Sequence, residues 1–205
     1  MSSYIIQLII IKITALTIAF LLGVVHVKEE KTVYYSIVKR TNIKVNDNIE
    51  KNETKQAKII LKKMLDYLEK NIPEIYISLN GKPYFKDSNI YFNYSHSKNY
   101  IACAISYYEI GIDIEETTRK INDDIAKKYL DNVIGNEKRI ETWVKKESYS
   151  KLKGLGLQMK FQNIKLDKIK TKNLFISGKD YMCSIYCDND DVEFKELGFN
   201  GSQLL

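Results

Sequence analysis

The feature that most constrains the fold is a series of three short apolar segments in the middle of the chain. They read IYFNYS, YIACAISYY and IGIDIE and span residues 90–95, 100–108 and 110–115. Each is rich in β-branched and aromatic residues, which is typical of strands. Residues 55–70 instead repeat their apolar positions with the period of an amphipathic helix. A chain that mixes strands with helices in this way is predicted to adopt an α+β fold.

The second half of the chain mixes helices and strands again. Residues 124–130 and 139–154 have helical patterns, and the second pattern meets Gly154 and Gly156, which favour helix ends. Apolar and polar residues alternate from residue 161 to residue 187, with Asn and Gly between them, which predicts antiparallel strands.

We expect two similar α/β halves in one chain that meet near residue 109. Residues 1–109 would form the first half, and residues 110–205 would form the second, which carries the acidic motifs described below. Two such halves in one chain would allow the protein to act as a monomer.

Residues 4–27 are almost continuously apolar and long enough to span a bilayer. Gln7, Lys12 and His26 interrupt the stretch, and it lacks the basic start and small-residue cleavage site of a signal peptide. Three interpretations stay open: a buried strand and helix, a membrane anchor, or a divergent start of the chain. The charge of Lys12 favours the first, so membrane association through residues 4–27 is the less favoured alternative.

The charge pattern argues against a nucleic-acid partner. The chain carries 32 basic and 26 acidic residues, a net charge of +6, and the two signs are interspersed. Nucleic-acid-binding proteins usually gather their basic residues on one face. The arginines are far apart, at Arg40, Arg119 and Arg139.

The cysteines indicate neither a disulfide framework nor a zinc site. Cys103, Cys183 and Cys187 are odd in number and form no CxxC pair. Each lies in an apolar segment, which predicts buried free thiols in strands. A reducing compartment such as the cytoplasm is expected.

The segment GIDIE places two carboxylates on one face of a strand. Side chains alternate along a strand, so Asp113 and Glu115 point one way while Ile112 and Ile114 point the other. Carboxylate oxygens are ligands that Mg²⁺ prefers, and bound Mg²⁺ often contacts substrate phosphates. The alternative is an ordinary solvated strand face.

The segment WVKKESYSK offers a third carboxylate and a cation. Glu147 and Lys151 are four residues apart and share one helix face. They would serve as a metal ligand and a phosphate contact, or else form a surface ion pair. Trp143 lies four residues before Glu147 and is expected to pack mainly in the core.

Two further segments suit phosphate binding. NYSHS places Ser95 and His96 at the end of a strand, where hydroxyl, imidazole and backbone N–H groups suit an anion. The alternative is a histidine that caps the next strand. GKPYF is a rigid turn that displays Lys82 between Gly81 and Pro83, and by itself it is only a turn.

The order and spacing of these segments resemble the Sfp-type 4′-phosphopantetheinyl transferase family. The resemblance covers Gly81 to about Leu157 and, more faintly, the strands up to Cys187. It implies two similar α/β halves with coenzyme A bound in the cleft between them, where the active site would lie.

The resemblance also implies a role for each matched residue. Asp113, Glu115 and Glu147 match the Mg²⁺ ligands, and Lys151 matches the lysine on the coenzyme A pyrophosphate. Glu147 and Lys151 are the catalytic candidates. The matches to the 3′-phosphoadenosine end of coenzyme A are Lys82, Ser95 and His96, with Gly81 and Pro83 in the same binding set.

The sequence departs from the family in its first half. Family members usually carry basic residues there, often arginines, that help to hold the 3′-phosphate. Here KQAKIILKKML, residues 55–65, has lysines in that place, and the first 27 residues do not match the usual opening strand. No single lysine is assigned to the phosphate.

The resemblance implies Mg²⁺-dependent transfer of 4′-phosphopantetheine from coenzyme A to a serine of an acyl or peptidyl carrier protein, with release of 3′,5′-ADP. The unusual first half motivates an alternative, a non-catalytic module that binds coenzyme A or a carrier protein. A membrane-tethered protein is a third interpretation. The complete set of three carboxylates favours the transferase.

Overall fold

The structure is a computed structural model that describes residues 30–45, 48–154 and 161–199. The apolar segment 4–27 lies outside these residues, as does Gly156. Within the described ranges, no helix is both long enough and apolar enough to cross a membrane.

The first sheet has the strand order β11-β1-β7-β6. Its members are β1 (Thr32–Lys39), β6 (Tyr91–His96), β7 (Tyr100–Ser106) and β11 (Glu193–Glu196). β1 and β6 each pair antiparallel with β7, whereas β11 pairs parallel with β1. A strand from near the end of the chain therefore completes a sheet that is built mainly from the first half.

The second sheet has the order β8-β10-β9 and is fully antiparallel. It consists of β8 (Ile110–Glu116), β9 (Lys172–Ser177) and β10 (Tyr181–Cys187). The register places Asp113 of β8 opposite Ser184 of β10. Two small hairpins complete the strands: β2 (Lys44–Val45) with β3 (Asn48–Ile49), and β4 (Ile75–Ile77) with β5 (Pro83–Phe85).

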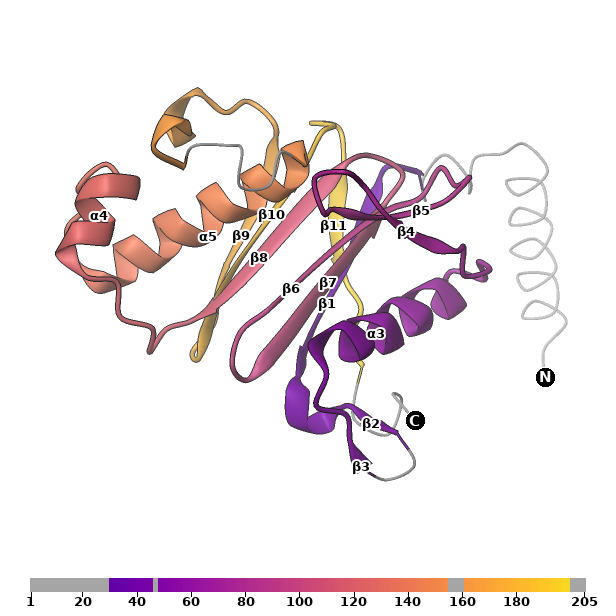
Figure 1. Cartoon of the computed structure of the whole chain (residues 1–205). Helices are drawn as coiled ribbons and strands as arrows, with labels where there is room; N and C mark the ends of the chain where they lie inside the picture. Colours follow the sequence, from indigo (N-terminus) through magenta and orange to yellow (C-terminus); the bar gives the residue numbers. More distant parts are fainter. Residues whose placement is uncertain (1–29, 46–47, 155–160, 200–205) are drawn as a thin grey trace, which may run out of the picture.

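Helices cover the outer faces of the two sheets (Figure 1). Helix α3 (Glu53–Tyr67) packs on β7 and β1, and helix α5 (Asn136–Lys153) packs on β8 and β10. The short helix α4 (Asp123–Tyr129) precedes α5. Asn52 caps α3 by accepting a hydrogen bond from the Lys55 backbone N–H, and Gly154 ends α5 in the left-handed conformation.

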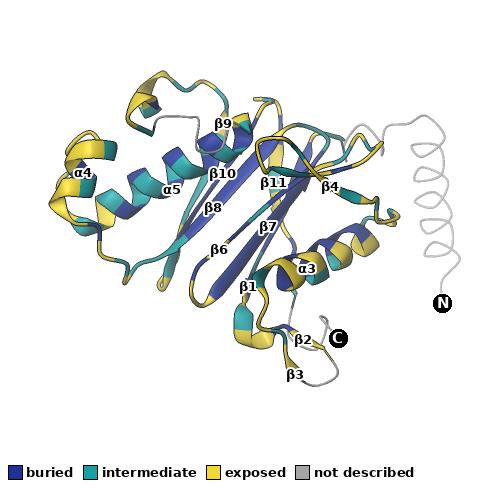
Figure 2. Ribbon diagram, in the orientation of Figure 1, coloured by how far each residue is buried: buried dark blue, intermediate teal, exposed yellow. Residues whose placement is uncertain are grey.

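The order of the layers follows from the alternation of side chains along the strands. In β7, Ile101 and Cys103 lie in the core under α3, whereas Ala102 and Ala104 lie in the core between the two sheets. Both faces of β7 are thus covered, and the strand is buried along its whole length (Figure 2). The layers run helix, sheet, sheet, helix.

Most elements predicted from the sequence are present. The helices expected at 55–70, 124–130 and 139–154 are α3, α4 and α5, and the three central strands are β6, β7 and β8. All three cysteines are free and buried, as predicted. The mixed α+β class is confirmed, while the division into similar halves at residue 109 stays a prediction.

The predicted strands at the start of the 161–187 segment are wrong. Strands occupy only β9 and β10, and two short 3-10 turns, Phe161–Asn163 and Leu166–Lys168, come before them. Ile164 is buried, and Phe161 lies against the Trp143 ring, so these residues cover helix α5. Alternating polarity here reflects packing on a helix rather than pairing in a sheet.

Helix α5 lies unusually close to β8 at Gly111. A β-carbon placed on Gly111 would lie 2.1 Å from the Ser148 carbonyl oxygen and 2.3 Å from the Leu152 nitrogen. Both atoms belong to the helix backbone, which cannot rotate away as a side chain would. The missing side chain at Gly111 therefore sets the distance between the helix and the strand.

Replacing Gly111 with alanine is expected to lower the free energy of unfolding by about 3 kcal/mol or more, because helix α5 must shift off the sheet. Urea denaturation followed by far-ultraviolet circular dichroism measures this change. Gly198→Ala is the matched control, since a β-carbon there meets nothing within 4 Å. Equal stability of the two variants would contradict the close contact.

Candidate active site

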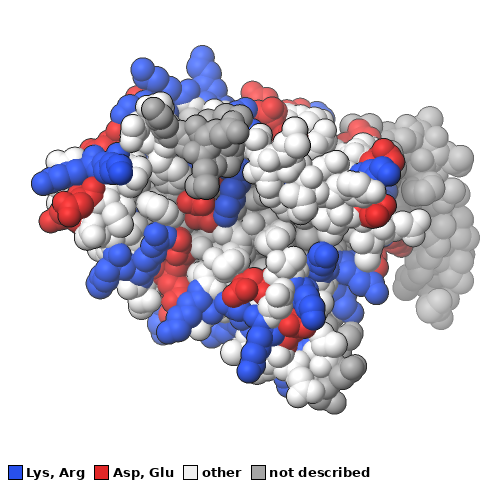
Figure 3. All heavy atoms as spheres, in the orientation of Figure 1, with Lys and Arg blue, Asp and Glu red and all other residues white. Residues whose placement is uncertain are grey.

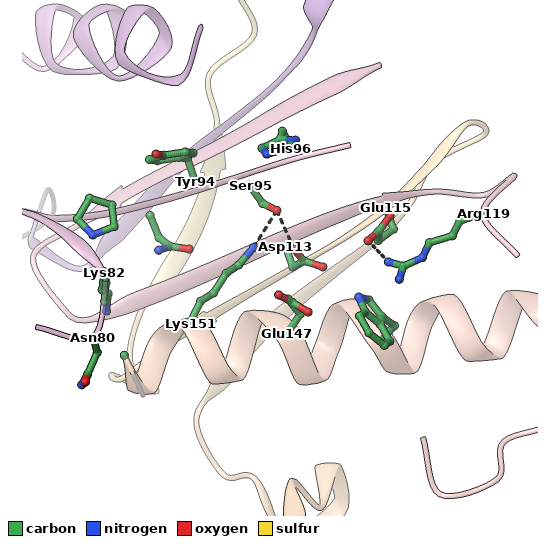
Figure 4. A pocket seen from close by; sticks show the side chains of 15 residues that line it. Asn80, Lys82, Tyr94, Ser95, His96, Asp113, Glu115, Arg119, Glu147 and Lys151 are labelled. Carbon is green, nitrogen blue, oxygen red and sulfur yellow. Dashed lines mark hydrogen bonds and ion pairs between the residues drawn. The ribbon is translucent and has the colours of Figure 1, made fainter. Parts of the chain in front are cut away.

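A pocket of about 540 Å³ opens where β6, β8, α5 and the turn between β4 and β5 meet. Its volume lies within the range of pockets that bind small molecules and cofactors. Figure 4 shows side chains from all four segments pointing toward this space. Figure 3 shows that basic and acidic side chains are interspersed over this face of the protein rather than separated by sign.

Every candidate site residue named from the sequence lines this pocket. Gly81, Lys82 and Pro83 come from the β4–β5 turn, and Ser95 and His96 from the end of β6. The strand β8 contributes Asp113 and Glu115, and the helix α5 contributes Glu147 and Lys151. The fold thus brings together four segments that are far apart in the sequence, while their individual roles stay predictions.

Of the three carboxylates that line the pocket in the described chain, Asp113 makes the most polar contacts. Its Oδ1 accepts a hydrogen bond of 2.7 Å from the Ser95 hydroxyl and lies 2.7 Å from the Lys151 ammonium. The Lys151 ammonium also donates to the Ser95 hydroxyl oxygen at 2.9 Å. Strand β6, strand β8 and helix α5 are therefore joined at one point of the pocket by a charged hydrogen-bond network.

The other two carboxylates are held in surroundings that disfavour their charge. Burial raises the pKa of Glu115 to about 7, and the nearby charges of Asp113 and Glu147 add to the effect while Arg119 opposes it. Burial also raises the pKa of Glu147, with a further contribution from Asp113. Both shifts mean that the charged forms of these two carboxylates are disfavoured mainly by their burial.

The three carboxylates suit a divalent cation in their chemistry. The second oxygen of Asp113, Oδ2, is buried without a hydrogen-bond partner, which is costly for a carboxylate. A cation beside it would satisfy this oxygen and would also offset the repulsion that adds to the effect of burial on the pKa values of Glu115 and Glu147. Oxygen donors of this kind fit Mg²⁺.

In the structure, the carboxylates of Asp113, Glu115 and Glu147 do not converge on one point. Among the described residues, no three Asp, Glu, His or Cys side chains are close enough to hold a metal ion. Two of the carboxylates are each bound to a cation of the chain: Asp113 to Lys151, and Glu115 to Arg119. Collecting the set around a metal would require these pairs to rearrange.

The turn at Gly81 closes one end of the pocket. Gly81 has a φ of +82°, a conformation that glycine adopts without strain, and its N–H donates to the Ser78 carbonyl. The Lys82 ammonium pairs with Glu109 and donates to the Leu152 carbonyl at 3.2 Å. This end is therefore tied to the last turn of α5. His96 is exposed at the end of β6.

Several residues that line the pocket were not singled out by the sequence. Arg119 was counted among scattered arginines, yet its guanidinium carbon lies 4.4 Å from the centre of the Trp143 ring. Trp143 was expected to pack in the core, and it does contact Phe161, but it also forms part of the pocket wall. The sequence held no local signal for the contact between Glu115 and Arg119, because a spacing of four residues relates side chains only on a helix, and Glu115 lies on a strand. The remaining residues are Asn80, Asn93, Tyr94 and Gly154.

Comparison with known proteins gives two curated relatives. The chain is 35% identical over 105 residues to the 4′-phosphopantetheinyl transferase gsp of Aneurinibacillus migulanus, across 46% of this chain and 44% of that protein. It is 35% identical over 91 residues to the 4′-phosphopantetheinyl transferase Sfp of Bacillus subtilis (strain 168), across 38% and 40% respectively. No protein-family profile matches the chain.

Part of the chain therefore resembles these two 4′-phosphopantetheinyl transferases. The matched part covers less than half of the length of each relative, 44% and 40%. Among the described residues, none of those that line the pocket comes from α3, the helix that carries the lysines of residues 55–65.

A buried lysine lies next to Glu147 in the sequence and ties helix α5 to its neighbours. Lys146 precedes Glu147 on α5 and is fully buried. Its ammonium donates to the Tyr129 carbonyl at 2.8 Å, to Asp131 at 2.9 Å and to the Phe161 carbonyl at 3.4 Å. Hydrogen bonds from Lys165 and Lys146 lower the pKa of Asp131. Lys146 thus joins the end of α4 to the segment that packs on Trp143.

Lys146→Met keeps the aliphatic part of the side chain but removes the ammonium, which leaves its acceptors without their donor. We expect a loss of about 2 kcal/mol in the free energy of unfolding, measured by urea denaturation. Lys145→Met, on the same helix but in a partly exposed ion pair, should change it by less than about 0.5 kcal/mol. Equal effects would mean that Lys146 contributes only as a surface lysine does.

Proposed function

We propose that the chain transfers the 4′-phosphopantetheine group of coenzyme A to a serine of an acyl or peptidyl carrier protein. The observation that carries this proposal is the convergence of four separate motifs on one pocket that holds carboxylates and cations together. The two relatives are both named 4′-phosphopantetheinyl transferase, which supports the same activity.

Coenzyme A would bind along the pocket through its phosphates. Lys82, Ser95 and His96 line one part and would contact the 3′-phosphoadenosine end, with Gly81 and Pro83 shaping the turn beside it. Lys151 would contact the pyrophosphate. Its ammonium lies among polar partners and is partly exposed, so it can exchange Asp113 for a phosphate oxygen without crossing an apolar region.

Asp113, Glu115 and Glu147 would hold a Mg²⁺ ion. The unpartnered Asp113 Oδ2 and the like charges of the three carboxylates support this assignment. When bound, Mg²⁺ supplies positive charge that stabilises the negative charge on the transferring phosphoryl group.

In the proposed reaction, the serine oxygen of the carrier protein attacks the β-phosphorus of the coenzyme A pyrophosphate. A new P–O bond forms, the bond from this phosphorus to the bridging oxygen breaks, and 3′,5′-ADP leaves with that oxygen. Lys151 stabilises the charge that builds on the phosphate oxygens. Glu147 accepts the serine proton, directly or through a water molecule, because its carboxylate faces the same space as Asp113 (Figure 4).

The first test is the intact mass of an apo carrier protein after incubation with this protein, coenzyme A and Mg²⁺. We expect the carrier to gain the mass of one phosphopantetheine group. A chelator should abolish the gain, and excess Mg²⁺ should restore it. Acyl and peptidyl carrier proteins are tested side by side.

Coenzyme A binding without any gain of mass on either carrier would support the non-catalytic alternative instead. A protein that is folded by circular dichroism but binds no coenzyme A would contradict both interpretations. The requirement for Mg²⁺ is tested separately, by comparing the reaction with and without the chelator.

Glu147→Gln tests the proton acceptor. We expect the rate of transfer to fall by about 100-fold or more, while the dissociation constant of coenzyme A, measured by calorimetry, changes much less. Glu141→Gln is the matched control, because Glu141 lies on the same helix, pairs with Lys138 and Lys145, and is outside the pocket. Equal losses in rate and in coenzyme A affinity would leave Glu147 as a metal ligand only.

A further inference from the structure

Arg119 holds one of the proposed metal ligands, although neither the proposed transfer step nor the metal set includes it. It follows β8, lines the pocket, and donates from Nη1 to the Glu115 carboxylate. Its guanidinium carbon lies 4.4 Å from the centre of the Trp143 ring. The Arg119 side chain is 31% exposed and that of Glu115 is 21% exposed, so the pair is only partly screened by water.

The backbone around Arg119 is held independently of its guanidinium. The Arg119 N–H donates to the Glu116 carbonyl at 3.0 Å, and the Arg119 carbonyl accepts from the Asn136 side chain at 2.8 Å. Asn136 also accepts from the Ile121 N–H at 3.0 Å. The side chain of Arg119 is therefore not needed to fix the path of the chain, and its contacts with Glu115 and Trp143 call for another explanation.

We propose that Arg119 is a positioning residue that competes with the divalent cation for Glu115. This inference rests on the proposed function, in which Glu115 is a metal ligand. Arg119 neutralises the carboxylate in the metal-free protein and must release it when the cation binds. Trp143 gives the guanidinium a second contact, so it stays at the pocket wall after release rather than entering solvent.

Competition for Glu115 and a purely structural role of Arg119 predict different changes in metal affinity when the side chain is removed. If Arg119 only supported the fold, its removal would weaken metal binding or leave it unchanged. If Arg119 competes for Glu115, its removal should tighten metal binding, because one positive charge leaves the site and one ligand is freed. A gain of affinity on losing a side chain is the distinguishing result.

The test is a Mn²⁺ titration of the full chain, with free Mn²⁺ measured by electron paramagnetic resonance and without coenzyme A or carrier protein. Mn²⁺ accepts the same oxygen ligands as Mg²⁺ and is observed directly. We expect Arg119→Gln to bind Mn²⁺ about five- to tenfold more tightly than the original protein. Arg119→Lys keeps the charge but loses the planar guanidinium, and should remain close to the original affinity.

Lys145→Gln is the matched control. Lys145 also pairs with a glutamate four residues away, Glu141, and its ammonium lies 4.5 Å from the centre of the Phe175 ring. It makes the same kind of contacts outside the pocket, and its loss changes the net charge equally. We expect no change in Mn²⁺ affinity, whereas the same tightening as in Arg119→Gln would reduce the effect to net charge and overturn the proposal.

Tryptophan fluorescence provides a second readout, since Trp143 is the only tryptophan in the chain. Mg²⁺ should change its emission in the original protein, because the guanidinium changes its contacts when it leaves Glu115. The change should be absent in Arg119→Gln. A Mg²⁺ response of equal size in that variant would contradict the movement of Arg119.

The outcomes separate this inference from the proposed function. Carrier modification together with unchanged or weaker Mn²⁺ affinity in a folded Arg119→Gln variant would overturn the role of Arg119 alone. Tighter Mn²⁺ binding in that variant without any carrier modification would support the competition and contradict the transferase activity. Absence of Mn²⁺ binding to the original protein and to the variant would overturn the competition.

Discussion

The backbone contact between helix α5 and strand β8 at Gly111 is the constraint on which the pocket depends. The helix lies so close that a single β-carbon would meet its backbone at 2.1 Å. A buried hydrogen bond of 3.0 Å from Ser148 to Ser184 fixes the helix along the sheet as well. Together these contacts bring Lys151 against Asp113, which lies two residues beyond Gly111 on the same strand face. A small displacement of the helix would separate the carboxylates from the cations.

Charge is the second constraint, because among the described residues the pocket gathers three carboxylates and three cationic side chains in a partly buried space. Lys151 and Arg119 each bind one carboxylate, yet the pKa values of Glu115 and Glu147 remain raised, and one oxygen of Asp113 has no hydrogen-bond partner. Under the proposed function, the carboxylates would take up a cation and Lys151 would contact a phosphate group. Binding either one changes the partners available to the other, so metal and coenzyme A would be coupled through these side chains.

The sequence was sufficient to predict the elements that carry the site. Helical periodicity identified α3 and α5, and short segments rich in β-branched and aromatic residues identified β6, β7 and β8. The segment from Phe161 to Lys168 was predicted wrongly, because alternating polarity looks the same whether a segment pairs with a strand or packs on a helix. Lys146 gave no signal, since a lysine within a lysine-rich helix is usually exposed, and only its three acceptors explain its burial.

Local spacing by itself determined which side chains share a face: Asp113 with Glu115 on a strand, and Glu147 with Lys151 on a helix. The order of the motifs indicated a resemblance to the Sfp-type 4′-phosphopantetheinyl transferases, and the two relatives matched over part of the chain carry that name. Only the tertiary structure decided that these faces meet, because the distance between β8 and α5 depends on a contact across the chain at Gly111. It also decided that Arg119 and Trp143 belong to the pocket, since contacts between side chains from different elements arise from packing and are not encoded in the spacing of either element.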